Sequence, residues 1–175
     1  CTPTPDQDAG SVTADQWLTM LQQMNLKVTF CPEDNLARLE DYTERLERRG
    51  IECLYRPYVN SIEEYLQQQG SSLDVIVIFR YMVAQSTLPL IQKYAPQAKV
   101  LFHTIDLHYL REEREAELYD CDERRLKAAK TKTMELAVCE EVDVICTHST
   151  LEKEEIQQHL PKAHIEISPL ILEMK

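Results

Sequence analysis

Residues 75–79 read Val75-Ile-Val-Ile-Phe79, a run of apolar residues at consecutive positions. A strand with one face in water alternates apolar and polar residues, whereas an unbroken apolar run is typical of a strand covered on both faces. A second run, Lys99-Val-Leu-Phe102, follows after a helical segment. Strands that are separated by helices indicate a parallel sheet with right-handed crossovers.

The same alternation extends along the whole chain. Strands are expected at residues 26–31, 51–55, 74–79, 99–103, 143–147 and 164–168. Helices are expected at residues 12–24, 35–49, 62–69, 83–94, 107–141 and 151–159, the fifth with a break at Asp120-Cys-Asp122. Gly50 and Gly70 follow two of these helices at the position where a left-handed residue ends a helix. The sequence therefore predicts a single α/β, Rossmann-like domain over residues 1–175, with a mostly parallel sheet of about six strands and helices on both faces.

The first residues of the chain lack a preceding strand. Residues 1–11 have the composition of a loop that follows a strand, and they lead into the predicted helix that holds Trp17. A doubly wound sheet begins with a central strand, so we expect that strand to lie before residue 1 and the chain to be a fragment of a longer protein. Two strands would then lack a neighbour. Either they close up, or another segment fills the gap, or a second copy of the chain pairs there.

Composition excludes several classes of protein. The formal net charge of −11 disfavours a general nucleic-acid-binding protein, although a few arginines and helix N-termini still suffice to bind a phosphorylated ligand. No apolar run is long enough to cross a membrane, and no signal peptide is visible. The six cysteines include no CxxC pair, so we expect reduced thiols, a cytoplasmic protein and no metal site. With only three glycines the chain has no Gly-x-Gly-x-x-Gly turn, which disfavours a nucleotide-cofactor dehydrogenase.

The richest group of polar side chains follows the strand that ends at His103. Residues 103–115 read His-Thr-Ile-Asp-Leu-His-Tyr-Leu-Arg-Glu-Glu-Arg-Glu. Open parallel sheets bind ligands at the carboxyl ends of their strands, so we expect a site here. At 100° per residue, one helical stripe contains His108, Arg111, Glu112, Glu115 and Tyr119. The alternative interpretation is a solvated helix end without chemistry.

Several segments occur in an order that is characteristic of one enzyme family. They are Thr4-Pro-Asp-Gln-Asp-Ala-Gly-Ser11, Lys27-Val-Thr-Phe30, residues 103–115, Glu135-Leu136, and Val142-Asp-Val-Ile-Cys-Thr-His-Ser149 with Glu152. Together they resemble the N-terminal half of retaining glycosyltransferases of family 4, which have the GT-B fold. The resemblance implies two Rossmann-like domains that face each other across a cleft. This chain would be the acceptor-side half, and a missing C-terminal domain would bind the nucleotide-sugar.

The resemblance also assigns a loop to the donor. The loop at residues 6–11 would lie near the donor phosphates and the reacting sugar, where backbone N–H groups can hold anionic oxygens. The candidates in it are Asp8, Ala9, Gly10 and Ser11. The alternative for Gly10 is that it only allows a tight turn.

The candidate catalytic residues are Asp106 and His108, which would contact the sugar or the acceptor hydroxyl. The alternatives are a helix N-cap for Asp106 and an exposed helix residue for His108. Substrate-binding candidates are Arg80, Arg111 and Glu115. Arg80 would bind a phosphate or an acidic acceptor. The alternative is that its side chain stays solvated. The i, i+4 spacing of Arg111 and Glu115 leaves simple pairing as the alternative for both.

The resulting hypothesis is a hexosyltransferase that moves a sugar from a nucleotide-sugar to a glycan, plausibly a surface polysaccharide. It needs no metal or other cofactor, and we expect the chain to be inactive without the second domain. The implied partners are the nucleotide-sugar, the glycan acceptor, the missing domain and, peripherally, a membrane, but no nucleic acid. The alternative is a non-catalytic Rossmann-like module for interaction or scaffolding, because a fold alone does not decide function.

Overall fold

The computed structural model describes residues 2–169, which form two compact units, one within residues 2–72 and one within residues 73–169. The single domain expected over residues 1–175 stays a prediction. Cys1, one of the six cysteines expected to be reduced, lies outside the described residues, whereas the other five are free thiols.

No helix within residues 2–169 is long and apolar enough to span a membrane.

The first unit contains a small parallel sheet. Its elements are α1 (Ala9–Gln23), β1 (Thr29–Phe30), α2 (Glu40–Arg48), β2 (Glu52–Cys53), α3 (Ile62–Gln69) and a short 3-10 helix, η1 (Gly70–Ser72). Strands β1 and β2 pair in parallel, with Phe30 opposite Cys53. Its core packs α1 and α2 against this pair through Leu18, Val28, Leu46 and Ile51.

Two expectations for this unit are wrong in detail. The helix expected from residue 35 begins at Glu40, because the Asn35 side chain accepts a hydrogen bond from the N–H of Ala37 and Leu36 has a φ of 49°. These local bonds offer the backbone an alternative to the helix. Gly50 ends α2 with a φ of 83°, as predicted, but Gly70 has a φ of −56° and continues into η1.

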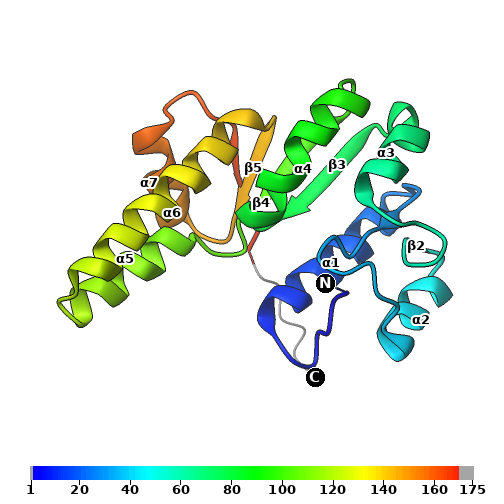
Figure 1. Ribbon diagram of the computed structural model, residues 1–175, viewed down its shortest axis with the longest axis horizontal. Helices are drawn as coiled ribbons and strands as arrows, with labels where there is room; N and C mark the ends of the chain where they lie inside the picture. Colours follow the sequence, from blue (N-terminus) through cyan, green and yellow to red (C-terminus); the bar gives the residue numbers. More distant parts are fainter. Residues whose placement is uncertain (1, 170–175) are drawn as a thin grey trace. The chain divides into compact units, whose positions relative to one another are not determined.

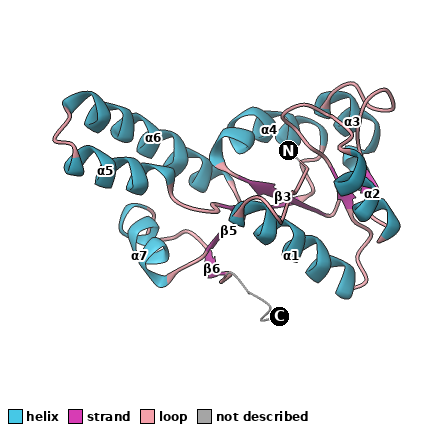
Figure 2. Ribbon diagram, turned by 90° about the horizontal axis from the view of Figure 1, so that it is seen from below, coloured by secondary structure: helices cyan, strands magenta, loops and turns pink. Residues whose placement is uncertain are grey.

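The second unit contains a larger parallel sheet (Figures 1 and 2). Its elements are β3 (Val75–Phe79), α4 (Tyr81–Tyr94), β4 (Lys99–His103), α5 (His108–Leu118), α6 (Asp122–Glu141), β5 (Val144–Thr147), α7 (Thr150–His159) and β6 (Ile165–Ile167). The strand order is β3-β4-β5-β6, and all three pairs are parallel. The six expected strands are thus present among the described residues, in two sheets instead of one. The α/β class with parallel sheets is confirmed.

The strand that is covered on both faces is β4, not β3. Val100, Phe102 and His103 of β4 are 0 to 7% exposed, and they come from both faces of the strand. In β3 only Ile78 is buried, and Val75 remains 47% exposed. The reason is position in the sheet, since β4 lies between β3 and β5, whereas within residues 2–169 β3 pairs only with β4.

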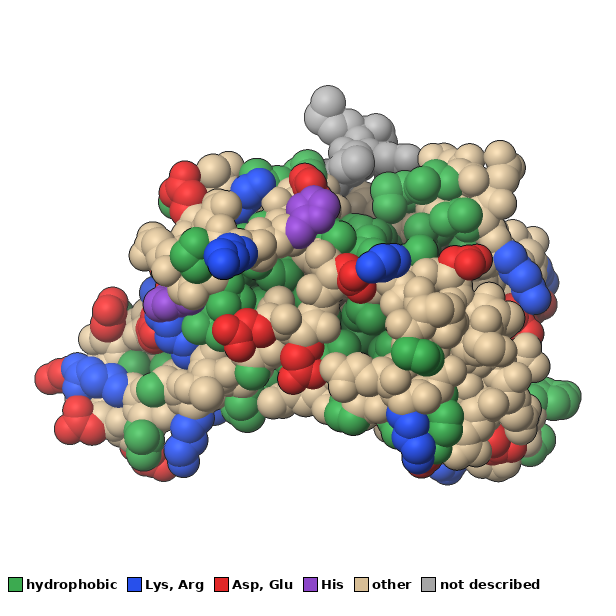
Figure 3. All heavy atoms as spheres, turned by 90° about the horizontal axis from the view of Figure 1, so that it is seen from above, with side chains coloured by type: hydrophobic (Ala, Val, Ile, Leu, Met, Phe, Trp, Pro, Cys, Tyr) green, Lys and Arg blue, Asp and Glu red, His purple; other side chains and the backbone are tan. Residues whose placement is uncertain are grey.

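The long helical segment after the fourth strand is broken where the sequence predicts. Helices α5 and α6 form a hairpin that extends away from the sheet (Figures 1 and 2), with the connecting Asp120 at a φ of 46°. The residue that precedes α6 is Cys121, and Asp122 is the first residue of this helix. On the face shown in Figure 3, acidic and basic side chains are interspersed over this hairpin without an extended patch of either sign.

Candidate functional site

The carboxyl edge of the four-stranded sheet carries two strained backbone positions. Arg80 directly follows β3 with a φ of 70°, and Ile105 follows β4 with a φ of 65°. A positive φ is uncommon for any residue with a side chain and rarest for a β-branched one such as Ile105, and it costs on the order of 1–3 kcal/mol. Both positions are held by His103. Its carbonyl accepts from the N–H of Arg80 at 3.1 Å, and its Nδ1 accepts from the N–H of Ile105 at 3.0 Å. Positive φ values also occur away from this edge, at Asn25, Leu36 and Asp120, so backbone strain by itself does not mark a site here.

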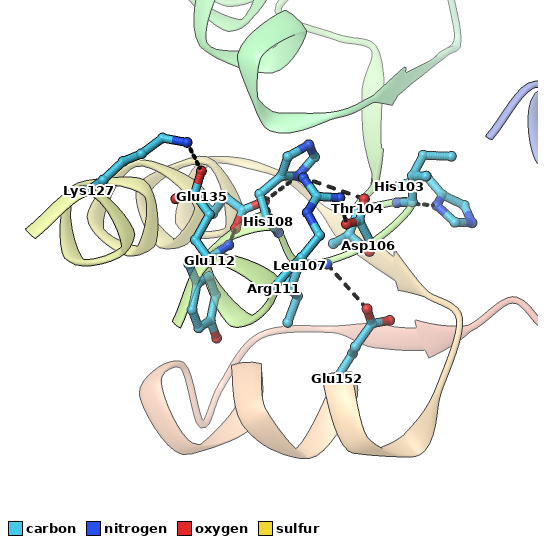
Figure 4. A network of polar contacts seen from close by, with 12 residues as sticks. His103, Thr104, Asp106, Leu107, His108, Arg111, Glu112, Lys127, Glu135 and Glu152 are labelled. Carbon is cyan, nitrogen blue, oxygen red and sulfur yellow. Dashed lines mark hydrogen bonds and ion pairs between the residues drawn. The ribbon is translucent and has the colours of Figure 1, made fainter. Parts of the chain in front are cut away.

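A buried carboxylate from α6 organises the start of α5. Glu135 is 1% exposed, and its two oxygens accept from the N–H groups of His108 at 3.1 Å and Tyr109 at 2.9 Å. These are N–H groups of the first turn, which have no partner inside their own helix. The residue before α5, Leu107, provides no side-chain cap. Glu135 belongs to α6 and caps the start of another helix, α5 (Figure 4).

The same carboxylate holds the imidazole of His108. Nδ1 of His108 lies 3.1 Å from Oε1 of Glu135, and the His108 side chain is 13% exposed (Figure 4). The hydrogen bond with Glu135 raises the pKa of His108, and the nearby Asp106 carboxylate adds to this, while burial and Arg111 oppose it. Because Nδ1 donates to a carboxylate, Nε2 is the nitrogen left for a ligand. It accepts a hydrogen bond when the ring is neutral and donates one when the ring is protonated.

Asp106 is not the N-cap of α5, because Leu107 occupies that position. Its carboxylate pairs with Arg111, and one oxygen lies 4.0 Å from Nδ1 of His108. Glu115 pairs with Arg124 of α6 and Arg111 pairs with Asp106, so the alternative of an i, i+4 pair between Arg111 and Glu115 is wrong. The structure thus brings Asp106, His108 and Arg111 together and leaves Glu115 in a separate ion pair.

Arg80 is exposed at the end of β3, and no partner for its guanidinium is found among residues 2–169. The ring of the next residue, Tyr81, meets the ring of His108 edge-on, with the centroids 5.1 Å apart. Arg80 is therefore one position away from a residue in contact with His108. Its expected role in substrate binding stays a prediction.

A second carboxylate ties two neighbouring loops together. Glu152, in the first turn of α7, accepts from the N–H of Leu107 at 3.2 Å and from the N–H of His148 at 3.1 Å. The N–H of Glu152 donates to the hydroxyl of Ser149, which is the N-cap of α7. The loops after β4 and β5 are thereby fixed to each other.

His103 supports the site and stays neutral. Its side chain is fully buried, stacked on Phe79 at 5.4 Å and tilted against His148 at 4.8 Å between ring centroids. Burial, together with the neighbouring His148, lowers the pKa of His103 to about 3. A ring that accepts at Nδ1 and carries no charge serves to hold the backbone of Ile105.

The predicted donor loop belongs to the first unit, whereas Asp106 and His108 belong to the second. Helix α1 begins at Ala9 and not at residue 12, so Ala9, Gly10 and Ser11 form its first turn. Gly10 is thus helical and is not part of a tight turn, which was the alternative for this residue. Asp8 is the N-cap, and its carboxylate accepts from the N–H of Ser11 at 2.9 Å and from its hydroxyl at 2.5 Å. A phosphate at this helix end would have to displace a carboxylate.

Glu135, which contacts His108 and the start of α5, is a residue of the candidate site that the sequence analysis does not identify. The apolar spacing along residues 122–141 predicts a buried face made of Leu126, Ala129, Thr133, Leu136 and Ala137. The buried residues are instead Ala128, Thr131, Glu135, Val138 and Cys139, and Leu126 is 60% exposed. The signal in the sequence was one glutamate at helical spacing with small and apolar residues. A buried carboxylate of this kind requires partners.

No protein-family model matches this chain, and no curated protein matches its sequence. Within the described part of the chain, no group of three or more His, Cys, Asp and Glu side chains is arranged to hold a metal ion.

Proposed function

We propose that this chain is the acceptor-side part of a retaining glycosyltransferase of the GT-B type, in which a nucleotide-sugar donates a sugar to a glycan. The His108–Glu135 pair carries the proposal. A buried carboxylate fixes the orientation of an imidazole whose Nε2 is available, at the edge of a parallel sheet where ligands bind. This arrangement suits the recognition of a hydroxyl group, which both donates and accepts hydrogen bonds.

Asp106 contributes a second polar group beside His108. Its carboxylate can accept hydrogen bonds from paired sugar hydroxyls while Arg111 offsets its charge. In the proposed reaction the protein orients the acceptor hydroxyl, excludes water and stabilises the departing phosphate by oriented dipoles. The residues that bind the nucleotide would belong to a further domain, so the 175 residues alone would not transfer sugar. The proposed protein acts in the cytoplasm, at or near a membrane.

The proposal is tested by measuring sugar transfer. The protein is purified in the form in which its source cells contain it. A panel of radiolabelled nucleotide-sugars is offered with glycan acceptors. We expect His108→Gln to lower kcat/KM by about 100-fold or more. His159→Gln is the matched control, because His159 is a histidine on α7 that pairs with Glu155. Transfer that is unchanged in His108→Gln would overturn the proposal and favour a non-catalytic module.

A further inference from the structure

His148, the first residue after β5, is held in one ring orientation. Its Nδ1 lies 2.9 Å from the carbonyl oxygen of Ser168, and its backbone N–H donates to Glu152 at 3.1 Å. A carbonyl oxygen can only accept a hydrogen bond, so Nδ1 carries a proton and is the donor. In the neutral ring Nε2 is then an acceptor. The side chain is half-buried, and no partner for its Nε2 is found among residues 2–169.

A row of three rings supports His148 along the carboxyl ends of β3, β4 and β5. Phe79 of β3 is directly opposite His103 of β4, and their rings stack with the centroids 5.4 Å apart. The His103 ring in turn meets the His148 ring, with the centroids 4.8 Å apart. Because His103 is fully buried, the His148 ring lies against a fixed neighbour. The sheet itself therefore presents His148, at the end where parallel sheets bind ligands.

One carboxylate joins His148 to the loop of the candidate site. Glu152 accepts from the N–H of His148 through one oxygen and from the N–H of Leu107 through the other. Leu107 lies between Asp106 and His108 in the chain, and Figure 4 shows the Glu152 carboxylate pointing toward its backbone. The spacing of the two oxygens within a carboxylate is fixed. The backbone of His148 is therefore held at a set distance from the loop that carries Asp106 and His108.

We propose that His148 is a further substrate-binding residue of this site, and that its Nε2 accepts a hydrogen bond from a hydroxyl group of the glycan acceptor. The inference rests on the proposed function and adds a residue to the same site.

The two histidines have complementary partners. A carboxylate holds the His108 ring and favours its protonated form, in which Nε2 donates. An uncharged carbonyl holds the His148 ring, whose Nε2 accepts when the ring is neutral. A ligand with several hydroxyl groups satisfies both rings, because each hydroxyl donates and accepts. A carboxylate ligand has no O–H group and cannot donate to Nε2 of His148.

Two replacements separate binding by Nε2 from support of the fold. In His148→Asn the side-chain amide can still donate to Ser168, but no atom takes the place of Nε2, whereas in His148→Gln the amide reaches the position of Nε2. In the protein purified from its source cells, we expect His148→Asn to raise the KM for the glycan acceptor by about fivefold, as the loss of one neutral hydrogen bond does. The kcat and the KM for the nucleotide-sugar should not change. His148→Gln should restore part of the affinity. An unchanged acceptor KM in His148→Asn, or an equal rise in both variants, overturns the proposal.

Chemical labelling tests the contact without sugar transfer. Diethyl pyrocarbonate acylates unprotonated imidazole nitrogens, and Nε2 is the reactive atom of His148 because Nδ1 donates to Ser168. Glucose, galactose and mannose are the probes, and mass spectrometry of peptides measures the rate at each histidine. The rate at His148 should fall about twofold when a bound sugar is present at its Kd. The exposed His164 is the control and should react at an unchanged rate.

Acetate is the anionic probe and should not protect His148. Protection by acetate alone, or by none of the three sugars, overturns the proposal. Protection by a sugar in a protein that transfers no sugar would support His148 as a sugar-binding residue and overturn only the proposed transfer reaction.

Discussion

Nδ1 of His108 and a carboxylate oxygen of Glu135 lie 3.1 Å apart, although 27 positions separate the two residues in the chain. The same carboxylate accepts from two backbone N–H groups at the start of α5. One buried side chain therefore fixes the beginning of a helix and the orientation of the histidine that this helix presents.

Glu135→Gln should lower both the pKa of His108 and the stability of the fold. The amide cannot match a carboxylate as acceptor for three donors, so we expect the free energy of unfolding to fall by about 3 kcal/mol. Urea unfolding measures this change, and NMR titration of the His108 ring measures the pKa. Glu140→Gln, an exposed glutamate on the same helix, is the control. A His108 pKa that is unchanged in Glu135→Gln would show that Glu135 does not act on the ring.

The stability lost in Glu135→Gln should itself depend on pH. Because the pKa of His108 is raised in the folded protein, its contribution to stability is fully present below the unfolded value of about 6.5. It is lost as pH rises through the folded pKa. The difference in unfolding free energy between wild type and Glu135→Gln should therefore be largest below pH 6.5 and narrow above it. A difference in unfolding free energy that becomes larger as the pH rises would contradict this prediction.

His103 should make the protein less stable in acid. Its folded pKa of about 3 lies below its unfolded value of about 6.5, so between these values the unfolded chain binds one more proton. In this range His103 lowers the free energy of unfolding by about 1.4 kcal/mol for each unit by which the pH falls. In His103→Gln, the slope of unfolding free energy between pH 4 and 6 should be smaller by that amount. An unchanged slope in His103→Gln argues against a neutral buried ring.

Asp8 should stabilise the protein by capping the start of α1. Asp8→Ala removes the acceptor for the N–H of Ser11 and should lower the free energy of unfolding by about 1 kcal/mol. Asp8→Ser keeps a capping oxygen and should retain most of the stability. Thermal unfolding of the three proteins measures the difference. If Asp8→Ala is as stable as wild type, the carboxylate is not the cap that the structure describes.

Gly50 should tolerate few replacements. Its φ of 83° is strained for an L side chain, although a Cβ atom there would have no neighbour within 4 Å. Gly50→Ala should therefore cost about 1 kcal/mol from backbone strain alone. Gly50→Asn should cost less, because asparagine adopts the left-handed region more readily. Stabilisation by Gly50→Ala would contradict this interpretation.

The alternation of apolar runs and helical segments was enough to predict the α/β class, since a strand and a helix have different periods. It located β3 and β4, and it placed the break between the two long helices at residues 120–122, one residue after the observed break at 119–121. It misplaced the starts of α1 and α2, because Asp8 and Asn35 act through side-chain hydrogen bonds to the backbone. The predicted buried face of α6 was also wrong, because small residues and a glutamate are buried there and Leu126 is exposed.

The candidate site, like the fold, could be predicted only in part from the sequence. The sequence by itself placed Asp106 and His108 after a buried strand, because the carboxyl ends of parallel strands follow from the order of strands and helices. Only the tertiary structure could show that Asp106 pairs with Arg111, that Glu115 pairs with Arg124, and that Glu135 holds His108. A local pattern records which face of an element is apolar. The partner of a buried charge is decided by how two helices pack, and positions 27 apart carry no local sign of that contact.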